Sequence, residues 1–482
     1  MRTFTRRSIL KTGLVSMPAL ALAKTSALAQ TTGTGYSRQP YYGQVATGCC
    51  VPDTAVAGRA SGVFRSPHFN RSGQTLSRLK IVVPNVKAMA GMTVQRQWAA
   101  RIEYPLNNTI GNVIKWNGQD LLTIPAADPN SQNTPPTFVV SDEISLTHPI
   151  PDNAMFWVRL WQCAPDYPGL IFRNMTYSSQ FPRSVNNALG ETNWTVNPAA
   201  TDIDTPVIQD SSNGNVWAFT GGSYSTGYVN WACVRPVAIL GPTRKPSFTL
   251  WGDSRMVGVG DIYDNVSIDR GEVERSIGPA FAYINFGIPG LRADQFLGNL
   301  DGIAFDYDPY LNLGATCTTN LIENLGGADI IALTANPNDP VTGALITNDP
   351  VGYTLGKKQD IWARWLAKSS LGATASSVST LTLPSVANGN FMNFSQTDAT
   401  GNGGIRDLNV LLRAGVQLNN AQVRVVDVAS AVSMFRQVTA DTTQFLWIPS
   451  ADPYTVDGTH ESQAGCYAIH DSGIFDLCAV CQ

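Results

Sequence analysis

The stretch that decides the fold is Ser247-Phe-Thr-Leu-Trp-Gly-Asp-Ser-Arg255. Its first part, 247–251, is a short apolar run that ends at Gly252, a pattern typical of a buried strand that enters a turn. The turn presents the hydroxyl of Ser254. A nucleophilic hydroxyl has to be exposed on a tight turn, and glycine supplies the backbone freedom for one. Gly252-Asp253-Ser254 alone is a weak signal, but its place after a strand makes Ser254 a candidate nucleophile.

Downstream of this turn, predicted strands alternate with predicted helices. Apolar runs at 329–333 and 423–428 are typical of buried strands, and 358–371 and 405–414 have helical character. Such alternation predicts a parallel sheet covered by helices on both faces. Active sites in these sheets lie at the C-terminal ends of the strands, which points to Ser254, Asn336 and the loop before His460.

The chain before residue 240 has a different pattern. Stretches 78–84, 97–104, 154–161 and 228–235 predict strands, and Gly, Asn and Pro clusters separate them. This region, residues 30–243, is therefore expected to be an all-β sandwich, jelly-roll-like, joined by a linker at 241–246 to a second domain, 244–482. Its Trp and Tyr side chains could stack on carbohydrate, but we expect most of them to fill the core of the sandwich.

Residues 1–29 are typical of an export signal. A basic stretch with Arg6-Arg7 precedes a modestly apolar run at 13–23, and Ala27-Leu28-Ala29 predicts cleavage after Ala29. The run 5–11 resembles the twin-arginine signal, which we favour over an ordinary secretory signal because Lys11 and the weak apolar run suit it. That run is shorter than the about 20 residues of a membrane span, and no later run is long enough. We expect an exported protein, periplasmic or secreted.

The composition excludes some partners. The 482 residues are 43% apolar and 14% charged, with 42 Gly and 29 Pro, which suits a folded chain with many turns and room for two cores. Removal of the signal leaves 28 basic and 36 acidic residues, a formal net charge of −8. Because Lys and Arg form no cluster, neither nucleic acid nor an anionic membrane is an expected partner.

Eight cysteines divide evenly between the two halves of the chain, and in an exported protein an even number predicts disulfides. Four cysteines in a domain allow three pairings, among which the sequence does not choose. Cys478-x-x-Cys481 could be a redox or zinc motif, but no further ligands accompany it, so we favour a cross-linked C-terminus. The eight are Cys49, Cys50, Cys163, Cys233, Cys317, Cys466, Cys478 and Cys481.

A second chemical block lies near the C-terminus, Asp457-Gly-Thr-His460. A serine hydroxyl is inert at neutral pH, so an imidazole has to accept its proton and a carboxylate has to orient that ring. Asp457 and His460 can supply both from one loop. The other histidines are excluded from this role, because His68 and His148 belong to the β-rich region and His470 lies on the presumed last helix.

With Gly-Asp-Ser after the first strand and Asp-x-x-His near the end, the chain resembles the SGNH/GDSL hydrolase family over about residues 247–482. The resemblance implies a three-layer α/β/α catalytic domain. The family's oxyanion glycine corresponds by position to Gly290, with Gly287 the weaker candidate. After the third strand the family has G-x-N-D, whose Asn also binds the oxyanion. Counting from the predicted strand 329–333 selects Asn336, whereas the Asn-Asp dipeptide selects Asn338. The G-x-S-x-G elbow of α/β-hydrolases is missing from the sequence.

The resemblance implies a serine esterase that works through an acyl-enzyme, without metal or organic cofactor, on a small-molecule or polysaccharide ester such as an O-acetylated carbohydrate. An acyltransferase with the same triad and a non-catalytic binding or assembly protein of the same fold remain alternatives. Arg255 could contact an anionic substrate, but we expect it to form a salt bridge with Asp261 or Asp264 instead.

Overall fold

Strand β18 (Ser247–Trp251) lies inside a seven-stranded sheet with the order β2-β19-β18-β20-β21-β25-β24. The computed structural model describes residues 40–50, 54–56, 61–87, 90–91, 95–126, 137–165, 171–173, 189–194, 198–210, 216–220, 234–262, 267–296, 308–339, 342–369, 377–418, 421–437 and 443–475. β18 is parallel to both its neighbours and fully buried, as predicted for 247–251. The strands are β2 (Cys49–Cys50), β19 (Ala282–Asn285), β20 (Asn320–Glu323), β21 (Ser377–Leu381), β24 (Val416–Leu418) and β25 (Ala421–Val426).

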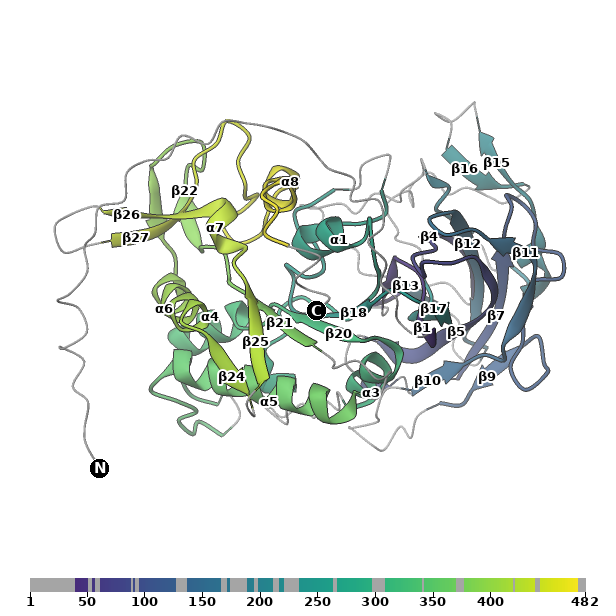
Figure 1. Cartoon of the computed structure of the whole chain (residues 1–482), viewed down its shortest axis with the longest axis horizontal. Helices are drawn as coiled ribbons and strands as arrows, with labels where there is room; N and C mark the ends of the chain where they lie inside the picture. Colours follow the sequence, from purple (N-terminus) through teal and green to yellow (C-terminus); the bar gives the residue numbers. More distant parts are fainter. Residues whose placement is uncertain are drawn as a thin grey trace. The chain divides into compact units, whose positions relative to one another are not determined.

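Helices cover both faces of this sheet, with α1, α7 and α8 on one side and α3, α4, α5 and α6 on the other (Figure 1). Alternate residues of β18 serve the two sides, because successive side chains of a strand point in opposite directions. Phe248 and Leu250 join the core under α1 and α8, whereas Trp251 joins the core under α3 to α6. The helices are α1 (Gly271–Ile277), α2 (Ala293–Phe296), α3 (Asp308–Cys317), α4 (Gly327–Ala335), α5 (Pro350–Lys368), α6 (Asn402–Arg413), α7 (Ala429–Val432) and α8 (Gln463–Asp471).

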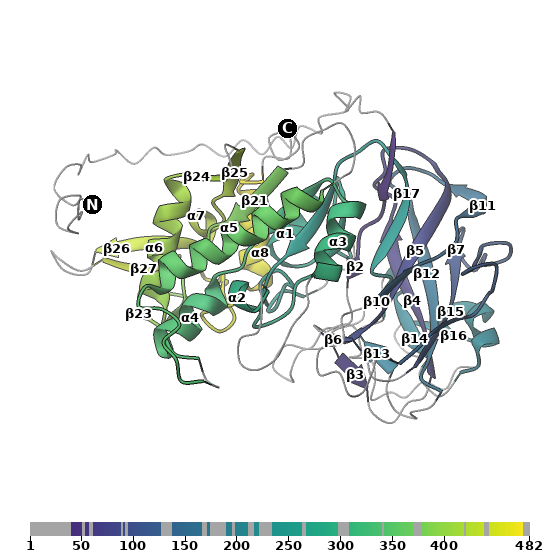
Figure 2. The ribbon, with the colours of Figure 1, turned by 90° about the horizontal axis from the view of Figure 1, so that it is seen from below.

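Twelve strands between Tyr41 and Thr243 form two six-stranded antiparallel sheets, seen beside the parallel sheet in Figure 2. Buried side chains of both sheets share one hydrophobic cluster, for example Ile81 of the first with Trp98 and Leu160 of the second. The first sheet contains β1 (Tyr41–Gln44), β5 (Leu76–Lys87), β6 (Ala90–Gly91), β10 (Thr137–Val140), β11 (Ile144–Ile150) and β17 (Ala238–Thr243). The second contains β4 (Ser61–Phe69), β7 (Arg96–Glu103), β8 (Val113–Ile114), β9 (Leu122–Ile124), β12 (Met155–Cys163) and β14 (Thr192–Trp194). An all-β, jelly-roll-like sandwich over residues 30–243 stays a prediction.

Shorter elements complete the described chain. Eight short strands form four antiparallel pairs. The pairs are β3 (Thr54–Val56) with β13 (Ile171–Arg173), β15 (Val207–Asp210) with β16 (Val216–Phe219), β22 (Ala387–Gly389) with β23 (Gln396–Asp398), and β26 (Ser433–Gln437) with β27 (Thr443–Trp447). A 3₁₀ helix spans Ala200–Asp204. No helix in the described ranges is both long and apolar enough to cross a membrane.

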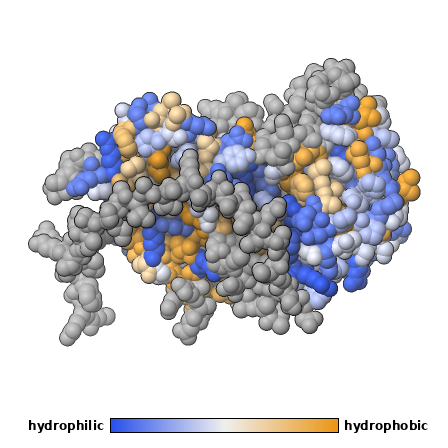
Figure 3. All heavy atoms as spheres, turned by 45° about the horizontal axis from the view of Figure 1, so that its top comes forward, coloured by the Kyte–Doolittle hydropathy of each residue, from blue (hydrophilic) through white to orange (hydrophobic). Residues whose placement is uncertain are grey.

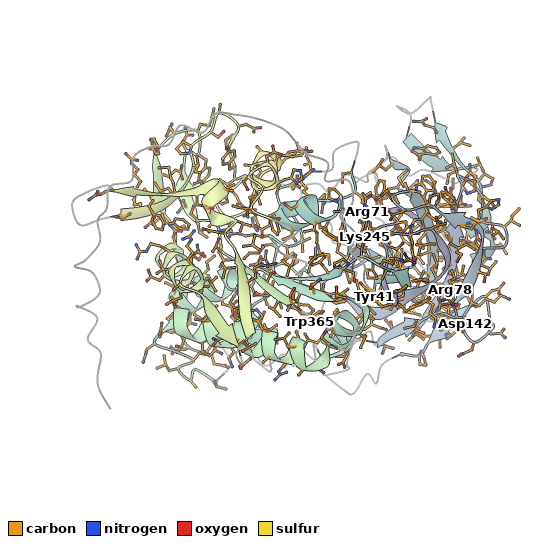
Figure 4. The ribbon with its side chains drawn as sticks, in the orientation of Figure 1. Tyr41, Arg71, Arg78, Asp142, Lys245 and Trp365 are labelled. Atoms are coloured by element: carbon orange, nitrogen blue, oxygen red, sulfur yellow. The ribbon has the colours of Figure 1, made fainter. Side chains whose placement is uncertain are left out.

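The part of the chain that forms the antiparallel sheets also contributes a strand and a hydrogen bond to the parallel sheet. Strand β2, from the first part of the sequence, pairs with β19 at the edge of the parallel sheet. The Tyr41 hydroxyl donates to the Lys245 carbonyl oxygen at 2.6 Å, near the start of β18, and both residues are labelled in Figure 4. Residues 241–243, predicted as part of a linker, instead complete β17, so only 244–246 separate it from β18. Residues 38–482 form one compact unit.

A buried charge network holds the second antiparallel sheet. Glu103 accepts hydrogen bonds from Arg65 at 2.8 Å and from Arg159 at 2.6 Å, and all three side chains are fully buried. Burial alone would raise the pKa of Glu103, but the two guanidinium groups lower it below its usual value. The carboxylate therefore stays ionised between its two partners.

Two sequence predictions are wrong. The apolar run at 329–333 forms part of helix α4, and a run this short cannot be assigned from apolarity alone. Cys49, Cys317 and Cys466 are buried free thiols rather than disulfide partners. Burial raises the pKa of the Cys317 thiol to about 12, so it is packed as an apolar, unreactive group. The export signal, the CxxC pair, Cys233 and residues 228–233 of a predicted strand lie outside the described residues.

Candidate functional site

The structure brings Ser254, His460 and Asp457 together. The His460 Nε2 atom lies 2.8 Å from Ser254 Oγ, and His460 Nδ1 lies 2.7 Å from Asp457 Oδ2. Both distances are within the range of a hydrogen bond. The three groups form a chain from hydroxyl to imidazole to carboxylate, although Ser254 and His460 are 206 residues apart in the sequence.

The turn after β18 explains the position of Ser254. Gly252 lies directly against the Asn324 side chain, and a Cβ atom there would collide with Oδ1 of that side chain. The buried Asp253 accepts the backbone N–H of Arg255 at 3.0 Å, which closes the turn. Because both neighbours of Ser254 are buried while Ser254 is partly exposed, the turn offers this hydroxyl alone to the surface.

The loop that carries His460 is fixed by its own hydrogen bonds. Asp457 Oδ1 accepts the backbone N–H groups of Thr459 and His460, both at 2.8 Å, while its Oδ2 faces the imidazole. The Thr455 hydroxyl donates to the His460 carbonyl oxygen at 2.8 Å. Trp447 Nε1 donates to the Gly458 carbonyl oxygen at 2.9 Å and ties the loop to β27. The imidazole is thereby held in one orientation.

Electrostatics keep the Asp457 carboxylate ionised. Partial burial raises its pKa, but the hydrogen bond and charge of His460 and the two backbone N–H groups outweigh burial and lower it to about 2. An ionised carboxylate at Nδ1 fixes the proton on that nitrogen and leaves Nε2 free to accept one. This tautomer suits removal of the Ser254 proton.

The loop after β19 continues alongside the Ser254 turn. The N–H of Ile288 donates to the Gly252 carbonyl oxygen at 2.9 Å. The N–H of Gly287 is occupied by Asn285 Oδ1 at 2.7 Å, whereas the N–H of Gly290 has no partner within the part of the chain that the structure describes. Gly290 has φ +73°, and the space beside its Cα is open. Of the two predicted glycines, Gly290 is therefore the available donor.

A buried carboxylate anchors this glycine loop. Asp329 accepts the N–H groups of Ala293 at 2.9 Å and Asp294 at 3.3 Å, directly after the loop. Burial, together with the neighbouring Asp294 charge, raises the pKa of Asp329 to about 7. Asp329 is not among the predicted site residues, because it begins the run 329–333 that has the pattern of a strand, whereas it lies in the first turn of α4.

Asn336 and Asn338 do not lie where the sequence analysis expected them. They follow α4, not a strand; both are exposed, and the Asn338 N–H donates to Asn336 Oδ1 at 3.1 Å. The start of α4 is beside the Ser254 turn, since a Cβ on Gly327 would lie 3.5 Å from Asp253 Oδ2. At about 1.5 Å per residue, Asn336 is about 13 Å farther along the helix, too far to reach the same oxyanion.

The third strand along this part of the chain is β20, which pairs with β18. Two residues after it comes Gly326-Gly327-Ala328-Asp329. Aligned on its glycine and aspartate, this segment matches the G-x-N-D pattern except that Ala328 stands where the family has asparagine. Asn324, at the end of β20, is no substitute, because its amide group donates to Glu272 Oε1 at 2.7 Å. The site therefore lacks the expected side-chain amide.

The remaining predicted residues are placed as follows. Arg255 is buried and forms its ion pair with Glu461 at 3.7 Å. The prediction of Asp261 as its partner is wrong, because Asp261 pairs with Arg275 at 2.6 Å. Asp264 lies outside the described residues. His470 lies in α8, and His148 is hydrogen-bonded to Asn108 at 3.0 Å. His68 is fully buried, which lowers its pKa to about 3.

Neither a family model nor a curated relative matches the chain. Solved structures do. The chain is similar to GDSL-type esterases and lipases. A carbohydrate acetylesterase from Sinorhizobium meliloti is 15% identical, with 49% of this chain and 100% of that chain covered and a TM-score of 0.30. An aryl esterase from M. smegmatis is 15% identical (49% and 100% covered, TM-score 0.31), and a GDSL-like lipase from Bacteroides thetaiotaomicron is 16% identical (49% and 87% covered, TM-score 0.29).

Within the described ranges, no group of three or more His, Cys, Asp or Glu side chains could hold a metal ion. A hydroxyl, a base and an oriented carboxylate in hydrogen-bond contact can activate a serine for attack on a carbonyl group.

Proposed function

We propose that this protein is an exported serine esterase that hydrolyses carboxylic esters through Ser254, His460 and Asp457. The observation that carries the proposal is the pair of contacts at His460, 2.8 Å to Ser254 Oγ and 2.7 Å to Asp457 Oδ2. In one short chain of hydrogen bonds they join the three roles that a serine nucleophile requires.

In the proposed reaction, His460 Nε2 removes the Ser254 proton as Oγ attacks the ester carbonyl carbon. The tetrahedral intermediate collapses to an acyl-enzyme, and His460 gives its proton to the departing alkoxide. A water molecule, deprotonated by His460, then attacks the acyl group, releases the acid and restores Ser254. Asp457 stays ionised and stabilises the imidazolium in both steps.

The oxyanion would be bound by backbone donors. The N–H groups of Ser254 and Gly290 make no hydrogen bond to other residues in the described ranges, so both can turn to the substrate oxygen. A well-placed donor of this kind lowers the barrier by about 3–4 kcal/mol. With Ala328 in the asparagine position, we assign two donors rather than three.

We further propose O-acetyl groups on carbohydrate as the substrate class, with residues 30–243 as an accessory β-sandwich. The support is architectural analogy: two packed antiparallel sheets adjoin the sheet that carries the triad. Acetate release from an acetylated polysaccharide, compared with a longer acyl ester, tests this. Adding a free sugar acceptor separates hydrolysis from acyl transfer, since a transferase would form a new sugar ester and release less acid.

Export is proposed from residues 1–29 and is tested by mass spectrometry of the N-terminus in the cell envelope and medium. A mature chain that begins at Gln30 supports it, and a full-length chain that stays in the cytoplasm contradicts it.

The decisive experiment compares wild type with Ser254→Ala on 4-nitrophenyl acetate and with a fluorophosphonate probe. Wild type should hydrolyse the ester and carry the label on Ser254. The variant should lose both, with unchanged thermal unfolding. Hydrolysis that persists at the wild-type rate in Ser254→Ala would rule out this nucleophile.

A further inference from the structure

Arg255 is bonded to residues on both sides of the catalytic base. Its backbone follows Ser254 directly, and its Nε donates to the Thr459 carbonyl oxygen at 2.9 Å. The same Nε lies 3.7 Å from Glu461 Oε1. Thr459 and Glu461 are the two neighbours of His460, so one guanidinium links the nucleophile turn to the loop of the base.

The Arg255 guanidinium also reaches a third loop. Its Nη1 donates to the carbonyl oxygen of Pro384, in the segment after β21, at 3.2 Å. Because β18 and β21 belong to one parallel sheet, the turn after β18 and the segment after β21 lie at the same edge of it, and Arg255 connects both to the His460 loop. The planar fork of arginine suits several acceptors at once, which a lysine ammonium cannot reproduce.

The environment shows that Arg255 does not serve substrate binding. Its side chain is 3% exposed, and Asp253, Glu272 and Glu461 surround it as buried acids. Burial raises the pKa of Glu272 to about 8, and Arg255 opposes that rise. Arg255 is therefore a counter-charge for these buried acids.

We propose that Arg255 is a positioning residue, whose guanidinium holds the His460 loop against the nucleophile turn and so sets the Ser254 Oγ to His460 Nε2 contact. This inference rests on the proposed function. Apart from the contact of His460 with Ser254, the other hydrogen bonds of the loop go to Thr455 within it, to Trp447 of β27 and to Ala387 of β22, whose N–H donates to the Gly458 carbonyl oxygen at 3.0 Å. Among the described residues, none of these three partners belongs to the turn after β18. They fix the shape of the loop but not its distance from Ser254.

Removal of the guanidinium should slow activation of the serine. A displacement of about 1 Å between reacting groups costs on the order of 100-fold in rate, so Arg255→Met should lower kcat by about 100-fold. KM should change less than twofold, because Arg255 does not touch substrate. Arg255→Lys keeps the charge but reaches fewer acceptors, and should recover about tenfold of that loss.

The experiment measures kcat, KM and the second-order rate constant for fluorophosphonate labelling of Ser254. All three are expressed per folded protein molecule, so that loss of folded protein is not counted as loss of activity. Labelling requires an activated serine and no specific substrate, so it separates positioning from binding. Arg159→Met is the matched control: Arg159 is equally buried, contacts Glu103, and donates to two backbone carbonyl oxygens, of Ile203 and Thr205.

The expected result is slow labelling in Arg255→Met, partial recovery in Arg255→Lys, and wild-type labelling per folded site in Arg159→Met. Labelling and kcat of Arg255→Met within threefold of wild type would overturn the inference, and so would an equal loss in Arg159→Met. If Arg255→Met does not fold, wild-type kcat in Arg255→Lys overturns it. Failure of the proposed function is distinct, since wild type itself would then not label at Ser254.

Discussion

If the proposed function is right, replacing Ala328 with asparagine should raise the rate of ester hydrolysis. Ala328 lies in the first turn of α4, between Gly327, which is beside Asp253, and Asp329, which is hydrogen-bonded to Ala293 and Asp294. The backbone of this turn is therefore fixed next to Ser254. Ala328 itself is partly exposed, so a larger side chain has room.

The magnitude follows from the number of donors. A third oxyanion donor contributes about 3 kcal/mol when well placed, and ordering the new side chain costs about 1 kcal/mol. The net of about 2 kcal/mol corresponds to a rise in kcat of about 30-fold. KM should stay unchanged, because the donor binds charge that exists only in the transition state.

Steady-state hydrolysis of 4-nitrophenyl acetate measures this change. Ala335→Asn, at the exposed far end of the same helix, controls for the weaker helix propensity of asparagine. A kcat in Ala328→Asn at or below that of wild type, with the protein folded and Ala335→Asn unaffected, would refute the assignment of Ala328 to the asparagine position.

Three further outcomes are expected. Asp457→Asn should lower kcat by about 10³- to 10⁴-fold in the same steady-state assay, because the imidazole loses its orienting charge; a loss under tenfold contradicts this role. Lys358→Met leaves buried Glu323 without the Lys358 Nζ contact at 2.9 Å and should cost about 3–5 kcal/mol in urea unfolding, far more than the control Lys357→Met. Burial and the acidic neighbour raise the pKa of Asp329 to about 7, well above its ordinary value, so the folded state binds more protons than the unfolded state between about pH 4 and pH 7. The free energy of unfolding should therefore fall as pH rises from about 4 to 7, and Asp329→Asn should flatten that slope in pH-dependent unfolding; an unchanged slope would show that Asp329 titrates normally.

The nucleophile and base could be predicted because their chemistry is local. Ser254 follows an apolar strand at a glycine, and Asp457 and His460 share one short loop, so each pattern is complete within a few residues. The His460 loop follows β27, which pairs with β26 outside the parallel sheet, so their contact over 206 positions was expected from the needs of a serine nucleophile and not from the order of the strands.

The third strand could not be predicted, because its buried polar residues depend on distant partners. β20 contains Glu323, which looks unsuited to a core but accepts hydrogen bonds from Lys358 at 2.9 Å and Trp362 at 3.1 Å, both on α5. The run at 329–333 is more apolar and fits the pattern of a buried strand better than 320–323 does. Because the oxyanion asparagine is expected just after the third strand, a strand at 329–333 predicts Asn336 or Asn338.

On the face shown in Figure 3, the exposed apolar side chains form several small patches among hydrophilic residues. In the strands of the two antiparallel sheets, five of the ten aromatic side chains are buried, among them Trp98 and Phe156, and the other five are partly exposed.

The pairing of β2 with β19 has a consequence for how the protein is made. Cys49 and Cys50 leave the ribosome more than two hundred residues before their partners Ile284 and Asn285, so the edge of the parallel sheet closes late. Pairing across so long a separation slows folding. A fragment that began at residue 244 would leave the hydrogen-bonding groups of β19 open along an edge, and such edges promote aggregation. Strand β2 thus covers this edge, and expression of the residues from 244 onward alone should give an aggregation-prone product.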